Sequence, residues 1–288
     1  MIGTYTQANN DRDRLAALAN AAMFDAEGTA HCVSASPHLT HKVVCDLYAS
    51  LVIRTFHAAR KHASVPRVLD LGAGEGSATL PFLELGAHVT AVDISESQLA
   101  VLQQKCGKFS QRLSVYRQDI NEMLGHSEER YDIVVMNSFV HHVPDYLALF
   151  RKAAAVLTPA GLIFSFQDPL RYDTLGKGTF YFSMGSYFFW RVFQGNYMQG
   201  LRTRIRRLQG IYIPGSKEDD AEYHVTRSGV DQDSLAQLLT SEGFTCEVVR
   251  YFSTQSAFFQ RLGCLLGMEN SFGIVAQRSQ VPPDVSRP

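Results

Sequence analysis

The sequence predicts an α/β fold in which strands and helices alternate around a mostly parallel sheet. Short, continuously apolar runs recur between amphipathic helical stretches through the middle of the chain. Such runs are typical of strands buried on both faces, and the alternation favours parallel pairing through right-handed crossovers. A length of 288 residues suits one large domain with an insertion, or one domain with a small cap.

Two helices are expected before the first strand, and they make residues 1–62 an N-terminal helical lid. The first begins at Asn10 and runs to about Met23, and the second is capped by Thr40. Apolar side chains at helical spacing form one face of the second helix: Val44, Leu47, Tyr48, Leu51, Val52 and Phe56.

The α/β pattern itself occupies residues 63–169 and 225–278. Strands are expected at Arg67–Leu71, Val89–Val92, Leu113–Arg117, Ile133–Met136, Leu162–Phe166, Cys246–Phe252 and Ser271–Ala276. Helices are expected at Thr79–Leu85, Ser95–Cys106 and Ser234–Leu239. One more helix is capped by Asp145, has Leu147, Phe150, Ala154 and Leu157 on one face, and is ended by Pro159 and Gly161.

Residues 170–224 interrupt this alternation with many aromatic side chains. They predict a mainly helical insertion after the fifth strand. A basic cluster, Arg202–Arg207, near its end favours a solvated helical face, then recognition of an acidic group, then contact with a membrane surface. Residues 279–288 are polar and proline-rich, which is typical of a flexible tail.

Charge and cysteine usage exclude several classes of protein. A formal net charge of −1 argues against nucleic acid as a partner. The five cysteines are scattered and include no C-x-x-C pair, which indicates free thiols and neither a disulfide framework nor a zinc site. The sequence predicts a cytoplasmic protein without stable membrane insertion, because it contains neither a secretory signal nor a long apolar span.

The functional inference depends on a glycine-rich turn, V-L-D-L-G-A-G-E-G-S, at residues 68–77. A strand that turns sharply into a helix while its backbone touches a ligand needs glycine there. Asp93 ends the next strand, 19 positions after Gly74. A carboxylate at that place can accept two hydrogen bonds from a ribose diol. The spacing predicts a nucleoside-cofactor site, the alternative being a tight turn that only packs.

The chemistry around the turn selects among nucleoside cofactors. A dinucleotide fingerprint needs a third glycine where this chain has Ser77. Asp70, just before the turn, would repel a pyrophosphate but suits a cationic ligand. S-adenosylmethionine, which has an amino group and a sulfonium but no phosphate, fits best. An NAD-dependent oxidoreductase is the rival interpretation.

The run D-L-G-A-G-E-G resembles motif I of class I S-adenosylmethionine-dependent methyltransferases, especially bacterial small-molecule enzymes of natural-product pathways. The resemblance covers residues 67–166 and, more loosely, 234–276. It implies a Rossmann-like, seven-stranded sheet whose last strand is antiparallel. It also implies that Asp93 holds the ribose, that Asp119 contacts the adenine and that Asn137 lines the methionine end. The full set of implied cofactor-binding residues is Asp70, Gly72, Ala73, Gly74, Asp93, Ile94, Asp119, Ile120 and Asn137.

The resemblance implies methyl transfer by in-line displacement to an oxygen or nitrogen of a small, apolar or aromatic metabolite. Such an acceptor loses a proton, so a base is expected at the carboxyl ends of the strands. His141 and His142 follow the fourth strand and are the candidates, with His142 the stronger. The alternative for each is a structural hydrogen bond to backbone. Gln167 and Asp168 are candidates for acceptor binding, unless Asp168 only starts the turn at Pro169.

The insertion and the N-terminal loop are expected to cover the site. Phe182 and Trp190 are candidates for lining the acceptor, the alternative being that these rings pack only the core of the cap. The loop through His31 and His38 is expected to fold over the cofactor, and each histidine is expected at a surface or helix end. No metal is expected, since Asn137 and Asp168 offer too few oxygen ligands.

Three further interpretations stay open from the sequence. A methyltransferase fold can use its cofactor structurally for other chemistry, such as a cyclisation. A nucleic-acid methyltransferase is disfavoured by the charge and by Asn137-Ser138-Phe139-Val140, which stands where such enzymes carry a Pro-Pro-aromatic signature. A homodimer is compatible with the sequence.

Overall fold

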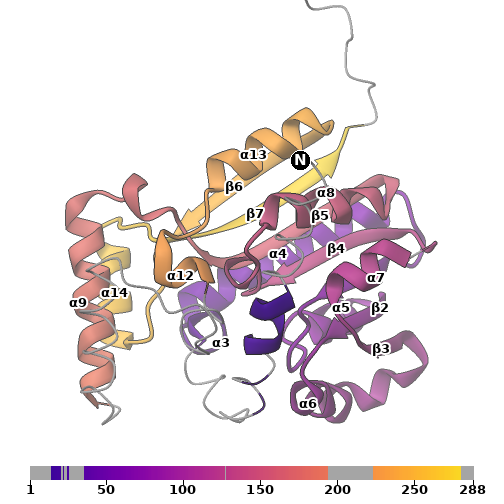
Figure 1. The fold of residues 1–288 in the computed structure, drawn as a ribbon, viewed down its shortest axis with the longest axis horizontal. Coiled ribbons are helices and arrows are strands. Elements are labelled where there is room, and N and C mark those ends of the chain that lie inside the picture. Colours follow the sequence, from indigo (N-terminus) through magenta and orange to yellow (C-terminus); the bar gives the residue numbers. More distant parts are fainter. Residues whose placement is uncertain are drawn as a thin grey trace, which may run out of the picture.

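The computed structural model describes residues 14–20, 22, 25, 36–126, 128–193 and 223–279. Its centre is a seven-stranded sheet in the order β3-β2-β1-β4-β5-β7-β6 (Figure 1). The strands are β1 (Arg67–Leu71), β2 (His88–Asp93), β3 (Leu113–Arg117), β4 (Tyr131–Asn137), β5 (Leu157–Pro169), β6 (Phe244–Tyr251) and β7 (Ser271–Arg278). Only β7 runs antiparallel to its neighbours. The predicted Rossmann-like sheet with an antiparallel last strand is confirmed.

Helices cover both faces of the sheet, and each face has its own apolar core. One face carries α4 (Lys42–Arg60), α5 (Thr79–Leu85) and α6 (Glu96–Cys106), and the other carries α7 (Ile120–His126), α8 (Tyr146–Ala155) and α13 (Gln232–Ser241). The predicted apolar face of α4 is buried, except that Leu47 is half-buried. The central strands are buried on both sides, which explains their continuously apolar sequence.

Among the described residues, the predicted helix cap at Asp145 is confirmed and the one at Thr40 is wrong, and the helix expected to begin at Ser95 begins one residue later, with Ser95 as its cap. Asp145 caps α8 by accepting from the Ala148 N–H, and Ser95 caps α6 by accepting from the Gln98 N–H. Thr40 does not cap α4. It is the last residue of a short helix, α3 (Pro37–Thr40), and its hydroxyl donates to the Ser36 carbonyl.

The boundary between α8 and β5 also differs from the prediction. Leu157 belongs to the strand, where it pairs with Tyr131, and α8 already ends at Ala155. The Tyr131 N–H donates to the Val156 carbonyl. The chain therefore joins the sheet before it reaches Pro159, the residue that the sequence predicted to end the helix. The helical spacing of Leu157 was therefore coincidental.

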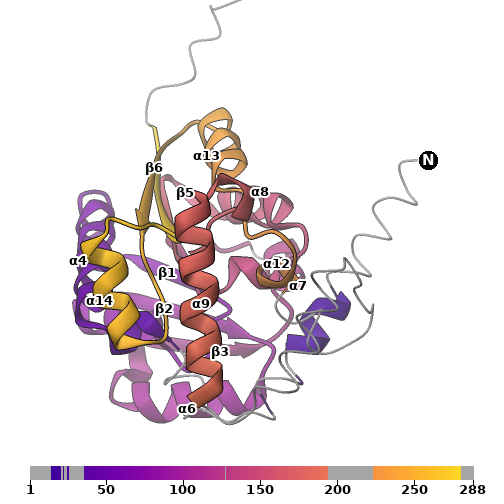
Figure 2. The same cartoon turned by 90° about the vertical axis from the view of Figure 1, so that its left-hand side faces the viewer.

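The predicted insertion begins with a short turn, η3 (Tyr172–Thr174), and the helix α9 (Lys177–Phe193). Residues 194–222, which contain the cluster Arg202–Arg207, lie outside the described residues, and α12 (Tyr223–Arg227) follows them. Figures 1 and 2 show α9 beside α14 (Ala257–Leu265) at one end of the molecule. Within the ranges described, no helix is long and apolar enough to cross a membrane.

Candidate functional site

The glycine-rich turn after β1 has a backbone that only glycine adopts without strain. Gly72 has φ 69° and Gly74 has φ 51°, both in the left-handed region. A Cβ on Gly72 would also lie 2.0 Å from the ring of Phe139. The turn is fixed by the N–H of Gly72, which donates to the Val92 carbonyl at 2.9 Å. The predicted need for glycine therefore has two causes here, the dihedral angle and the close ring.

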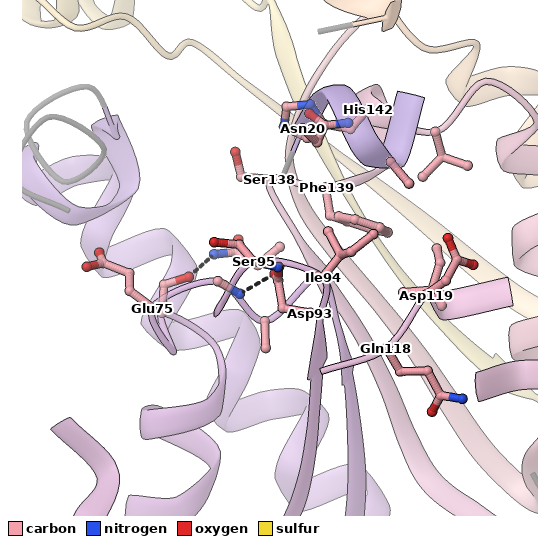
Figure 3. Close-up of a pocket in the computed structure, with 18 of the residues that line it drawn as sticks. Asn20, Glu75, Asp93, Ile94, Ser95, Gln118, Asp119, Ser138, Phe139 and His142 are labelled. Carbon is pink, nitrogen blue, oxygen red and sulfur yellow. Dashed lines mark hydrogen bonds between the residues drawn. The ribbon is translucent and has the colours of Figure 1, made fainter. Parts of the chain in front are cut away.

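Asp93, at the end of β2, is fixed by two backbone donors. Its Oδ2 accepts from the Gly74 N–H and its Oδ1 from the Ser95 N–H, each at 2.8 Å (Figure 3). Burial raises the pKa of this carboxyl, while the two N–H groups act in the opposite direction. The side chain thus joins the turn to the start of α6, and each oxygen keeps acceptor capacity for a ligand.

A cleft lies over the carboxyl ends of the parallel strands, where open α/β sheets bind ligands. It brings together most of the predicted site residues: Gly72, Ala73, Gly74, Asp93, Ile94, Asp119, Ile120, Asn137 and His142. Figure 3 shows Asp93 and Asp119 at the ends of neighbouring strands, with Ile94 between them. Asp119 also accepts from the Asn121 N–H at 2.8 Å, which fixes its direction.

Asp70 is not among the residues that line this cleft. It is buried beneath the turn, where its Oδ2 accepts from the Thr79 hydroxyl at 2.6 Å. Burial raises its pKa to about 7. Its contact with Thr79 ties the end of β1 to the first residue of α5.

A polar cluster that the sequence did not predict lies in the wall of the cleft. The Asn137 Nδ2 donates to the Ser77 hydroxyl at 2.8 Å and lies 3.0 Å from the His38 Nε2. The Asn137 Oδ1 and the His38 Nδ1 are both buried without a hydrogen-bond partner. Burial lowers the pKa of His38 to about 4, so its imidazole is neutral. His38 is therefore buried in the cleft wall and not a surface residue, although it does lie in the last turn of the short helix α3, as one of the two expectations had it.

The segment before α4 contributes residues to the wall of the cleft. Among its described residues, Ala17, Asn20, Ser36, His38 and Leu39 line the cleft. Asp25 attaches the segment to the start of α6, because one carboxylate oxygen accepts from the hydroxyls of Ser95 and Ser97 at 2.6 Å each. The expected position of His31 lies outside the described residues.

The two candidate bases lie in different surroundings. Both belong to the short turn η2 (Val140–His142), but only His142 lines the cleft. The His141 backbone N–H donates to the Asp168 Oδ1 at 3.1 Å, and its Nδ1 lies 2.8 Å from the same oxygen. The rings of His141 and His142 are in contact, with centroids 4.1 Å apart. Asp168 thus holds His141, and His141 packs against the histidine that faces the cleft.

Burial acts on both members of the Asp168–His141 pair. It raises the pKa of Asp168 to about 8 and lowers that of His141 to about 3. The pair therefore stays neutral as a unit and keeps one proton until about pH 8. In the unfolded chain the same two residues lose that proton near pH 6.5, the ordinary value of histidine.

This difference predicts a fall in stability between about pH 6.5 and pH 8. The folded state binds the extra proton in that window, so the free energy of unfolding decreases by about 2 kcal/mol as the pH rises. Asp168→Asn, which mimics the protonated acid, should remove most of this slope. Urea unfolding of both proteins at pH 6.5, 7.2 and 8.0 measures it. Equal slopes in the two proteins would show that the pair holds no extra proton.

The four predicted acceptor-side residues do not line this cleft. Asp168 is buried against His141, and the Gln167 Nε2 donates to the Ser253 hydroxyl at 2.7 Å. Phe182 contacts Phe252 and Phe259, and Trp190 contacts Tyr187. Both rings take part in packing, but the partners of Phe182 lie before and in α14, outside the predicted cap of residues 170–224, and not in the core of the cap as the alternative required. In the part of the chain that the structure describes, His, Cys, Asp and Glu form no cluster suited to a metal ion.

Comparison with known families gives a match over the site-bearing half of the sheet. Residues 68–161 match the family described as "Methyltransferase domain". The chain is 30% identical over 152 residues to a ubiquinone biosynthesis O-methyltransferase of Xanthomonas campestris pv. campestris, a match covering 53% of this chain and 58% of that protein. It is 39% identical over 97 residues to the enzyme of that name from a Bradyrhizobium species, covering 34% and 38%. The chain thus spans less than two thirds of the length of these relatives.

A solved structure shares the fold across almost the whole chain. The plantazolicin methyltransferase BpumL, solved in complex with SAH, superimposes with a TM-score of 0.50 at 15% sequence identity. The superposition covers 95% of this chain and 99% of that one. Residues 68–161 therefore match a methyltransferase domain, and the chain as a whole shares the fold of a class I methyltransferase.

Proposed function

We propose that this chain binds S-adenosylmethionine in the cleft and transfers its methyl group to an oxygen or nitrogen of a small, apolar or aromatic metabolite. The observation that carries the proposal is the gathering of the glycine turn, Asp93, Asp119 and Asn137 around one cleft. All four lie inside the residues that match the methyltransferase family. The names of the relatives favour oxygen as the acceptor atom.

The polar groups of the cleft suit the separate parts of this cofactor. Asp93 offers acceptor oxygens to a ribose diol, and Asp119 at the end of the next strand offers one to an adenine amino group. The unpartnered, buried Asn137 Oδ1 suits the ammonium of the methionine end. A buried acceptor without a partner is costly, and a ligand donor would remove that cost. Ile94 and Ile120 also line the cleft and offer apolar contacts to the adenine ring of the cofactor.

The cofactor supplies an electrophilic methyl group, and the chain supplies orientation, exclusion of water and a place for the acceptor proton. His142 faces the cleft and is the candidate to take that proton. Phe139, Val143 and Pro144 line the cleft around it and suit an apolar acceptor. The N-terminal segment, through Asn20 and His38, covers the cleft and limits the access of water. We further propose a cytoplasmic enzyme that acts on natural-product-like metabolites and not on nucleic acid.

Calorimetric titration with S-adenosylhomocysteine, with NAD as a parallel ligand, tests the cofactor. We expect binding of the former alone, because Ser77 stands where a dinucleotide fingerprint has its third glycine. Binding of NAD alone would overturn the proposal. A panel of phenols, carboxylic acids and amines, incubated with S-adenosylmethionine and followed by mass for an added methyl, then identifies the acceptor. Products that change mass without gaining a methyl would favour the alternative of cofactor-assisted chemistry such as cyclisation.

A further inference from the structure

The helices α9 and α14 lie beside each other at one end of the molecule (Figure 2), and several of their large apolar side chains are exposed. We call this part of the surface the α9–α14 face, and its exposed large side chains are Tyr181, Tyr187, Phe188, Phe189, Val192, Phe258, Leu265 and Leu266. The most exposed of these are Leu265 at 82%, with Tyr181 and Phe258 at 69% each. Large apolar patches of this kind on a protein surface mark sites of interaction.

Two serines of α9, Ser183 and Ser186, point inward, whereas its large aromatic side chains Tyr181, Phe188 and Phe189 are exposed, which is the reverse of an ordinary surface helix. The Ser183 hydroxyl accepts from the Asn270 Nδ2 at 3.1 Å, and the Ser186 and Thr254 hydroxyls are hydrogen-bonded at 2.9 Å. Phe182 adds an apolar contact, with its ring 5.6 Å from that of Phe259 in α14. These contacts fix the rotation of α9 about its axis. The exposed aromatic side chains therefore cannot turn toward the core.

The charges of the two helices have one sign. Neither α9 nor α14 contains an aspartate or a glutamate, whereas Lys177 and Arg261 are exposed on them. In a two-fold contact between copies, the cations of these helices would meet no carboxylate from the partner's α9 or α14, and the first one after α14 in sequence is the exposed Glu269. An anionic lipid surface would instead supply phosphates for the cations and an acyl boundary for the rings.

We propose that the α9–α14 face docks the protein onto an anionic membrane surface. The aromatic and aliphatic side chains enter the headgroup region, and Lys177 and Arg261 contact lipid phosphates. This is peripheral attachment by one face, and it is independent of what the cleft binds. The sequence predicts a protein without stable membrane insertion. The proposal agrees with that prediction, because no segment spans the membrane, and adds only a contact with its surface.

Trp190 makes this proposal directly measurable, because it is the single tryptophan of the chain and lies in α9. The full chain is titrated with vesicles of phosphatidylcholine alone and with equimolar phosphatidylcholine and phosphatidylglycerol. We expect flotation with the mixed vesicles, a blue shift of Trp190 emission, and quenching by brominated acyl chains. Affinity for the mixed vesicles should be about tenfold or more above that for phosphatidylcholine, given about fivefold for each cation.

Two variants and one control separate the contribution of the apolar side chains to vesicle binding from that of the cations. Tyr181→Ser/Phe258→Ser/Leu265→Ser should abolish flotation, and Lys177→Ser/Arg261→Ser should remove the preference for phosphatidylglycerol. The control, Val43→Ser/Ile53→Ser/Tyr116→Ser, removes three exposed apolar side chains elsewhere and should bind vesicles like the parent. No flotation of the parent chain would overturn the proposal. So would a dimer in sedimentation velocity that only the first variant dissociates, since the face would then bind a second copy.

Discussion

Replacing Asp93 by alanine is expected to weaken the binding of S-adenosylhomocysteine by about 100-fold. A ribose diol would lose a charged acceptor, and each hydrogen bond to a charged group contributes about 1.5–3 kcal/mol. The Gly74 and Ser95 N–H groups would also lose the oxygens that now fix the turn. Isothermal titration of the variant and the parent gives the ratio of dissociation constants.

Asp231→Ala is the matched control for this substitution. Asp231 also accepts a backbone N–H, from Ser234 at the start of α13, but it is not among the residues that line the cleft. It should cost stability, as the loss of a helix cap does, by about 1 kcal/mol, and leave the affinity for the ligand unchanged. Equal affinity of Asp93→Ala and the parent would show that the ribose is held elsewhere.

Three residues of the cleft could be predicted from the sequence because of the geometry of parallel strands. Asp93, Asp119 and Asn137 each stand at the carboxyl end of a strand, and adjacent parallel strands bring their ends to one edge. The strands themselves can be predicted from the sequence because their apolar runs are uninterrupted. Local sequence therefore sufficed to predict that these three residues lie together at one edge of the sheet.

Gln167 and Asp168 do not line the cleft because a local irregularity in β5 changes the direction of their side chains. The pairing of β5 with β7 shifts register between Ser165 and Asp168, and Gln167 has φ 66°. Such a bulge changes which face a residue points to. Gln167 consequently turns toward Ser253, and Asp168 turns inward to His141. A bulge depends on the partner strand, which the sequence of β5 alone does not reveal.

His38 was missed for a different reason. It reaches the cleft by packing of the N-terminal segment onto Asn137, which lies 99 positions away in sequence. Pro37 did carry a local signal, since proline is favoured at the first position of a helix. That signal predicts the start of the short helix α3, but it does not predict which surface of the protein α3 packs against.

Replacing His142 by alanine is expected to lower turnover of the methyl acceptor by about 100-fold or more, the usual contribution of a general base. The affinity for S-adenosylhomocysteine should be nearly unchanged, because the groups assigned to the cofactor lie on Asp93, Asp119 and Asn137. Steady-state kinetics with the acceptor found by the mass screen, together with titration of S-adenosylhomocysteine, separates the two effects.

His142→Gln distinguishes a base from a residue that only positions the acceptor. Glutamine keeps a hydrogen-bonding side chain but cannot take a proton, so it should be as slow as alanine if His142 is the base. Added imidazole should then restore part of the turnover of His142→Ala. The exposed His57 provides the control, and His57→Ala should keep full activity. If glutamine also keeps full activity, the acceptor proton leaves by another route, and the contact of His142 with the Asp168–His141 pair serves to hold the wall of the cleft in place.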